Sequence, residues 1–295
     1  MADEARATVG VIGGSGLYQM PDLVDVVEVE LDTPFGPPSA PLTIGTLAGA
    51  RVAFLPRHGR HHEYGPAQVP ARANIWALKA IGVERVIAVS AVGSLRETLH
   101  PLDLVVPDQI VDRTVGRPRT FFDAGPVVHV GLADPFCPQL RDALIWAASQ
   151  ASDRVHAGGT YLCIEGPQFS TRAESQLYRQ WNLDIIGMTA MPEARLAREA
   201  ELCFAVLAMV TDYDVWHASA EDVTVEQVVA NLRRNAETAR MVVRNVVARL
   251  ARPRACACGN ALEHAIATAP EGVPAEVRRR LRLLLDRYLP AEPAG

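Results

Sequence analysis

Lysine is almost absent from this chain: Lys79 is the only lysine among its 295 residues. A P-loop for nucleoside triphosphates ends in the pattern G-x-x-x-x-G-K-[ST], and the sequence has no lysine in such a place. The glycine-rich segment 13–16 (GGSG) also does not fit the G-x-G-x-x-G pattern of dinucleotide-binding folds. We therefore expect no nucleoside triphosphate site.

An excess of positive charge is lacking too. The chain has 29 Lys and Arg against 34 Asp and Glu, a net charge of −5. Broad nucleic-acid binding needs a basic surface, so we expect no nucleic-acid partner. No apolar run reaches the roughly 18 residues of a membrane span. The acidic N-terminus lacks a basic region followed by an apolar core, as a secretory signal would have. We expect a cytoplasmic protein without a membrane partner.

Cysteines are few, and five of them do not make a disulfide scaffold in a chain of this length. Cys137, Cys163 and Cys203 lie in apolar or motif-bearing segments, and we expect them to be reduced and buried. Cys256 and Cys258 form a C-x-C near the C-terminus. This pair could form a local disulfide, cross-link subunits or bind a metal. Free thiols are favoured, because disulfides are unusual in the cytosol.

What the sequence does contain is an alternation of short apolar runs and helical patterns. This pattern predicts an α/β fold: a single domain at 1–251 with a central twisted mixed sheet flanked by helices. Residues 252–295 are expected to be a C-terminal extension with the C-x-C and an amphipathic, leucine-rich helix. Strands are expected at 9–12, 42–47, 51–55, 83–94, 160–167, 184–191 and 202–214, and helices at 69–81, 138–151, 171–181, 192–200 and 224–250. Residues 102–112 are expected to form either a pair of strands or one strand with a bend at Pro107.

Polar, glycine-containing motifs follow several of these strands, where ligands usually lie in such sheets. Backbone N–H groups of a glycine-rich turn can converge on an oxyanion, and Ser15 adds a hydroxyl donor. Arg57 offers a planar fork that matches phosphate oxygens, and His58 can donate one more hydrogen bond. Ser90 with the backbone of Ala91, and Thr189, add small neutral donors. Together these residues predict a phosphate site with few charges and many directed donors.

A different kind of motif, TDYD at 211–214, ends the most apolar strand. Asp212 and Asp214 are two residues apart, so they point to the same side if the strand persists. Carboxylates there suit a ligand with donors, such as a 6-amino group and a protonated ring nitrogen. Two solvated or helix-capping aspartates are the alternative.

Ten motifs occur in an order that resembles the methylthioadenosine phosphorylase branch of the trimeric purine-nucleoside phosphorylase family. The resemblance covers roughly residues 8–250. Any one motif would be weak, whereas the ordered set is specific. The motifs are GVIGGSGLY, DTPFGPPSAP, LPRHGRHHEY, ANIWALKAIG, SAVGSL, PDQIVDRT, ADPFCP, IEGPQFSTRAES, IGMTAMPEARLARE and TDYDVW.

The resemblance implies phosphate-dependent cleavage of the N-glycosidic bond of methylthioadenosine, giving adenine and 5-methylthioribose 1-phosphate, a reaction of purine and methionine salvage. No metal or organic cofactor is implied, and inorganic phosphate is a co-substrate. Phosphorolysis of methylthioinosine or another purine nucleoside, a water-using nucleosidase and a non-catalytic nucleoside-binding protein are the alternatives. The residues implied at the phosphate are Ser15, Arg57, His58, Ser90, Ala91 and Thr189.

The resemblance also implies roles at the nucleoside. Met188 would lie under the ribose, Phe169 would face the base, and Asp212 and Asp214 would contact the 6-amino group and N7. Asp212 is the expected catalytic residue, with a pKa raised by burial so that it can share a proton with N7. A carboxylate suits a 6-aminopurine, whereas the branch of the family specific for 6-oxopurines resembles a pattern with Asn instead.

Three further positions bear on the 5′ group and on assembly. Val225 matches an apolar contact to the methylthio group, and Ser170 matches a position linked to specificity. His129 matches a histidine that reaches a neighbouring subunit's site, so a homotrimer or a dimer of trimers (a hexamer) is expected. His61 and His62 are read as a polar surface turn rather than a metal site, because adjacent side chains do not face together. Glu165 is left as a possible ribose or network residue.

Overall fold

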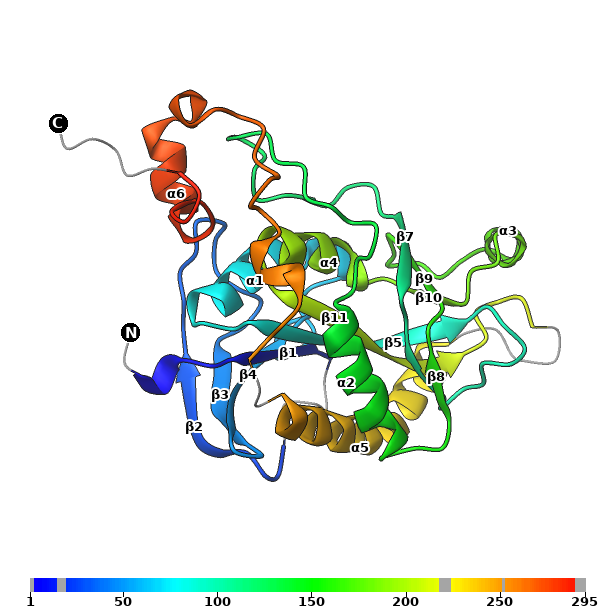
Figure 1. The fold of residues 1–295 in the computed structure, drawn as a ribbon. Helices are drawn as coiled ribbons and strands as arrows, with labels where there is room; N and C mark the ends of the chain where they lie inside the picture. Colours follow the sequence, from blue (N-terminus) through cyan, green and yellow to red (C-terminus); the bar gives the residue numbers. More distant parts are fainter. Residues whose placement is uncertain (1–2, 15–19, 218–223, 251–252, 290–295) are drawn as a thin grey trace.

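A mixed sheet forms the centre of the computed structural model, which describes residues 3–14, 20–217, 224–250 and 253–289 (Figure 1). Its main path runs β2-β3-β4-β1-β5-β10-β9-β7, while β11 pairs with β5 and β6, and β6 pairs with β8. The strands are β1 (Val9–Gly13), β2 (Val24–Val29), β3 (Leu42–Leu47), β4 (Ala50–Pro56), β5 (Arg85–Ser94), β6 (Leu104–Val106), β7 (Gln109–Arg113), β8 (Val155–Ala157), β9 (Thr160–Ile164), β10 (Ile185–Gly187) and β11 (Cys203–Asp212).

Helices cover both faces of this sheet (Figure 1). On one face α1 and α4 pack with the extension in one apolar core, and on the other face α2 and α5 build a second core. The expected α/β domain with a mixed sheet and a helical C-terminal part is thus confirmed. The helices are α1 (Ala71–Ala80), α2 (Pro138–Ser149), α3 (Arg172–Gln180), α4 (Ala190–Glu199), α5 (Val225–Arg249) and α6 (Ala275–Leu285).

The parallel run β4-β1-β5-β11 positions the ligand-binding motifs. β1 is parallel to β4 and β5, and β11 is parallel to β5. β1 and β11 are buried throughout, as near-continuous apolar strands covered on both faces should be. Because these strands run in one direction, their carboxyl ends share one edge of the sheet. The motifs that follow β1, β4 and β11, and the carboxyl-terminal half of β5, therefore meet there.

Local sequence signals set several helix starts. Pro138 is the first residue of α2, where its missing N–H costs no hydrogen bond. Thr171 caps α3: its hydroxyl accepts from the Glu174 backbone, and the Glu174 carboxylate accepts from the Thr171 backbone. Trp76 is buried within α1.

The stretch 102–112 forms a pair of strands, which is one of the two arrangements expected there, because Pro107 ends β6 and β7 then pairs with β9. Other strand expectations need correction. The strand expected at 184–191 ends at Gly187, since the chain turns into α4. β2 and β8 were not expected; β2 is largely exposed, so it carries no buried apolar run. β11 ends at Asp212, and Asp214 lies in a turn with φ of 53°.

The C-terminal extension packs on its own chain. Leu281, Leu284 and Leu285 of α6 are buried in the same core as α1 and α4. The backbone of Val128 bridges that of Ile266, and Ala267 N–H donates to the Val127 carbonyl at 2.8 Å. In the described part of the chain, no helix has the length and apolar character needed to cross a membrane.

Candidate active site

A cavity of about 510 Å³ opens at the shared carboxyl edge of β1, β4, β5 and β11. Its walls bring together residues from segments far apart in the sequence, as the strand directions require. The backbone N–H of Arg57 donates to the Gly13 carbonyl at 3.0 Å, which ties the end of β4 to the end of β1. The predicted site residues that line it are Arg57, His58, Ser90, Ala91, Phe169, Ser170, Met188, Thr189, Asp212, Asp214 and Val225.

Three hydroxyl groups that line this cavity lack hydrogen-bond partners among the described residues; one is Ser170 Oγ, and the other two belong to residues predicted at the phosphate. These two are Ser90 Oγ on β5 and Thr189 Oγ1 after β10, and both atoms are buried. A buried polar atom without a hydrogen bond costs free energy, roughly 1–3 kcal/mol. A ligand with several acceptor oxygens would remove that cost at both positions. This arrangement fits the expected anion site in the cavity.

Arg57 is held by a residue that the sequence did not single out. Its Nε and Nη2 lie 2.6 and 3.0 Å from the two carboxylate oxygens of Glu193, and its Nη1 donates to the Val89 carbonyl at 2.9 Å. Both side chains are almost fully buried. The paired fork is fixed in orientation, and its charge is balanced by Glu193. Binding of an anion here would thus depend mainly on hydrogen-bond donors that point at it, and little on net positive charge, as the sequence predicted.

His58 occupies the rim of the same region. Its Nδ1 lies 2.8 Å from the Tyr64 carbonyl oxygen, so Nδ1 carries a proton and donates it there. Burial, followed by the charge of Arg57, lowers the pKa of His58 from 6.5 to about 4. The hydrogen bond that we expected His58 to donate to phosphate is therefore donated within the chain instead. The neutral ring presents Nε2 as an acceptor, which suits a protonated phosphate oxygen. His62 stacks on this ring and also lines the cavity, although we expected only a surface turn.

Asp212 and Asp214 also line the cavity. The Asp212 carboxylate accepts from Thr211 Oγ1 at 2.7 Å and from the Asp214 backbone N–H at 2.8 Å. Burial raises the pKa of Asp212 above its ordinary value, and the same cause raises the pKa of Asp214. The expected direction for Asp212 is therefore confirmed. Both carboxyl groups reach the cavity even though the strand does not persist to Asp214.

Gly93 leaves the space that Asp212 occupies. A Cβ atom at position 93 would lie 2.7 Å from Asp212 Oδ1 and 3.3 Å from the Asp214 backbone nitrogen. Glycine is thus required by the close approach of the carboxylate to β5. From the other side, Asn231 of α5 donates to the Thr211 carbonyl at 2.7 Å. The end of β11 is held between these two elements.

Part of the cavity wall is apolar. Phe169, Met188, Val225 and Val229 line it, with Val225 and Val229 coming from the first turns of α5. Phe169 and Val225 are exposed, so this side of the cavity is open. Such a wall accepts an apolar substituent without leaving a polar group unpaired.

Arg117 organises the backbone around this wall. Its Nη1 donates to the carbonyls of Met188 and Met191 at 2.7 and 2.6 Å, and its Nη2 donates to the Glu165 carbonyl at 2.5 Å. The Glu165 carboxylate lies 3.2 Å from Arg117 Nε. Glu165 is thus a network residue, which was one of the two roles left open for it. Arg117 itself was missed, because nothing local distinguishes it from other arginines.

Two predicted residues lie elsewhere. Ser15 lies outside the described residues, although Gly14 before it lines the cavity. His129 is exposed and is not part of the cavity; its backbone N–H donates to the Ala265 carbonyl at 2.8 Å. Its expected reach into a neighbouring subunit stays a prediction. Within the described residues, no group of three or more metal-binding side chains lies in the cavity.

Comparisons with known proteins agree with this geometry. Residues 8–248 match the model of the phosphorylase superfamily. The chain is 55% identical to an S-methyl-5′-thioadenosine phosphorylase of Gloeobacter violaceus, over 96% of each chain. It also resembles the crystal structure of a methylthioadenosine phosphorylase from an Antarctic soil metagenomic library, with a TM-score of 0.91 and 50% identity over 95% of this chain and 99% of that one. A methylthioadenosine phosphorylase from Schistosoma mansoni in complex with adenine gives a TM-score of 0.78 and 34% identity over 95% of this chain and 98% of that one.

Proposed function

This chain belongs to the phosphorylase superfamily, and we propose that it cleaves S-methyl-5′-thioadenosine with inorganic phosphate. The products are adenine and 5-methylthioribose 1-phosphate, so the enzyme is a pentosyltransferase. One structural observation supports this assignment most directly. Unpartnered hydroxyl donors line the same cavity as two buried carboxyl groups with raised pKa.

The phosphate-binding residues perform the first task of the reaction, which is to place an anion against the ribosyl carbon. Ser90, Thr189 and Arg57 direct donors at phosphate, and His58 Nε2 accepts from a protonated phosphate oxygen. The nucleophile is already anionic and needs only positioning and a fixed electrostatic environment. No metal or organic cofactor takes part in this step as we propose it.

The two carboxyl groups perform the second task, which is to stabilise the departing base. Asp212 in its protonated form shares its proton with N7 of the purine as negative charge develops there. Burial raises the pKa of Asp212, which increases the protonated fraction near neutral pH. Asp214 accepts from the 6-amino group, and this carboxylate disfavours a 6-oxo group.

The apolar wall accounts for the 5′ group. Val225 and Val229 accept the methylthio group, whereas a 5′ hydroxyl there would lose its hydrogen bonds to water. We expect the ratio kcat/KM to be highest for methylthioadenosine. It should be lower for adenosine, and lower still for methylthioinosine and inosine.

Measuring adenine and hypoxanthine release from these four nucleosides tests the proposal. A preference for methylthioinosine over methylthioadenosine would contradict the roles of Asp212 and Asp214. A preference for adenosine would contradict the role of the apolar wall. Variants Val225→Ser and Val225→Ile separate the polarity of that wall from its size: only the serine variant should narrow the gap between the 5′-methylthio and 5′-hydroxy substrates.

We also propose that the chain works as a homotrimer or as a dimer of trimers. His129 is exposed and away from its own cavity, so it is available to a neighbouring subunit. Analytical ultracentrifugation measures the assembly. Mixing inactive His129→Ala subunits with inactive Asp212→Asn subunits should restore part of the activity, because some sites then combine an intact residue from each. If mixing restores nothing although the subunits exchange, His129 acts within its own chain or not at all.

A further inference from the structure

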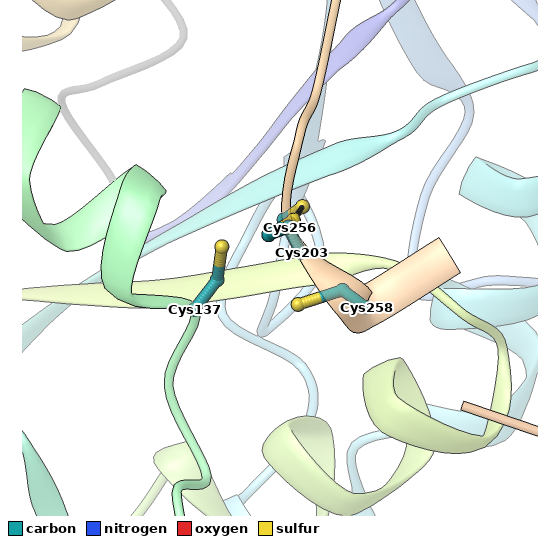
Figure 2. Close-up of side chains that lie close together, drawn as sticks. All are labelled: Cys137, Cys203, Cys256 and Cys258. Carbon is teal, nitrogen blue, oxygen red and sulfur yellow. Dashed lines mark hydrogen bonds between the residues drawn. The ribbon is translucent and has the colours of Figure 1, made fainter. Parts of the chain in front are cut away.

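Four of the five cysteines gather at one point (Figure 2). Cys137 directly precedes α2, and Cys203 is the first residue of β11. Cys256 and Cys258 come from the extension, where they flank the start of a 3-10 turn at Ala257–Asn260. Three separate segments of the chain thus contribute thiols to one cluster.

The sulfur atoms form a single group rather than two pairs. All four Sγ atoms lie within 4.8 Å of one another, and those of Cys203 and Cys256 are 3.2 Å apart. None of these cysteines is in a disulfide bond. Tetrahedral zinc with Zn–S bonds of about 2.3 Å separates its sulfur ligands by about 3.8 Å. The observed spread brackets this value, so small side-chain rotations suffice to reach the coordination geometry.

The burial of the four cysteines also fits a structural zinc site. Cys137, Cys203 and Cys258 are at most 3% exposed, and Cys256 is intermediate. The cluster lies against the core formed by α2, α5 and the sheet. Four sulfur ligands without an open position for water are typical of structural zinc sites, whereas catalytic zinc sites keep one position open.

We propose that Cys137, Cys203, Cys256 and Cys258 bind one structural Zn²⁺ ion, which fastens the C-terminal extension to the catalytic domain. Each thiol gives up its proton to solvent as its sulfur coordinates the metal, so no oxidant or reductant is needed. Cys203 and Asp212 are at opposite ends of β11, about 30 Å apart at 3.3 Å per residue. The ion therefore takes no part in the reaction.

The location explains what the ion would stabilise. Nearby, the Glu201 carbonyl accepts from Arg254 Nη1 at 2.6 Å, and the Glu201 carboxylate accepts from the Leu262 backbone N–H at 3.1 Å. The extension then continues to the strand-like contact between Ile266 and Val128, the residue before His129. A metal bound at residues 256–258 would hold the beginning of the C-terminal extension against the catalytic domain.

Metal content tests the proposal. Protein purified under reducing conditions, without chelator, should contain about one zinc ion per chain by mass spectrometry of the metals. The double variant Cys256→Ser/Cys258→Ser should lose the zinc, whereas Cys163→Ser, a buried cysteine outside the cluster, should keep it. Cobalt added to metal-free wild-type protein should give the absorption of a tetrahedral tetrathiolate, which requires no variant to fold.

Limited proteolysis reads out the structural role: removing zinc should expose residues 253–289 to cleavage and zinc should restore protection. Metal-free protein that binds neither zinc nor cobalt under reducing conditions would overturn the proposal. So would an intact mass lower by two or four hydrogens in protein protected from air, because the thiols would then be disulfides. These measurements use no substrate, so they do not depend on the proposed reaction.

Discussion

The guanidinium group of Arg57 and the carboxylate of Glu193 form a bidentate ion pair that is almost completely buried beside the cavity. The two residues are 136 positions apart: Arg57 directly follows β4, and Glu193 lies in the first turn of α4. The pair fixes the arginine in the orientation that the proposed phosphate site needs. It also leaves the site close to electrically neutral.

Removing one partner of this pair should destabilise the protein strongly. Glu193→Ala removes the carboxylate that faces the buried guanidinium of Arg57, and we expect a loss of about 3–5 kcal/mol in the free energy of unfolding. The double variant Arg57→Ala/Glu193→Ala should lose less than the sum of the two single variants, because no lone charge remains. Urea unfolding of all three measures this, and additive losses would show that the two side chains are not coupled.

The unpartnered hydroxyls should matter for phosphate and not for the nucleoside. Ser90→Ala and Thr189→Ala should each raise the KM for phosphate about 10–100-fold, since a hydrogen bond to a charged group contributes roughly 1.5–3 kcal/mol. The KM for methylthioadenosine should change little. Ser94→Ala on the same strand is the control, because its hydroxyl contacts the Arg96 carbonyl instead of the cavity. Equal effects of all three variants would contradict the assignment.

Asp212→Asn should separate activity from stability. Without a proton to share, the variant should lose about 10²–10⁴-fold in kcat. Burial raises the pKa of Asp212 in the folded state above its ordinary value of 3.8. The protonated carboxyl group therefore stabilises the wild-type fold fully below pH 3.8, and this stabilisation is lost as the pH rises through the raised pKa. Relative to wild type, the variant should therefore be more stable at pH 8 than at pH 4. Unfolding at the two pH values tests the sign, and the opposite order would mean that Asp212 is not buried as described.

Gly93→Ala should disturb Asp212 most, because the added Cβ would lie 2.7 Å from Asp212 Oδ1 and 3.1 Å from Ile186 Cγ2. The added Cβ would press on Asp212 Oδ1, and a displacement of about 1 Å can cost about 100-fold in rate. Gly116→Ala is a matched control, because a Cβ there meets no atom within 4 Å. Turnover and thermal unfolding of both variants distinguish a displaced carboxylate from a misfolded chain. Normal turnover in Gly93→Ala would show that the carboxylate position is not critical.

The parts of the fold and site that the sequence predicted are those with a local signal. Apolar strands followed by polar motifs located Arg57 and Asp212 at strand ends, and the parallel run β4-β1-β5-β11 brings both to one edge. Ser90 lies inside β5, and Thr189 follows β10, which is antiparallel to β5, although both residues line the same cavity. Each of these motifs spans only a few residues. The sequence therefore could not show which distant side chains contact each site residue.

Glu193 illustrates this limit. In the sequence it is an ordinary acidic residue after a proline at a helix start, where negative charge is common anyway. Only the packing of α4 against the sheet turns it toward Arg57. The thiol cluster is similar: the C-x-C was visible, but its meeting with Cys137 and Cys203 depends on how the extension returns to the domain.

Phosphate dependence tests the central claim most directly. The purified protein, freed of phosphate, is incubated with methylthioadenosine with and without inorganic phosphate, while adenine and the sugar product are measured. We predict adenine release only when phosphate is present, with one 5-methylthioribose 1-phosphate formed for each adenine. Adenine release at the same rate without phosphate, giving free 5-methylthioribose, would contradict the account and identify a nucleosidase.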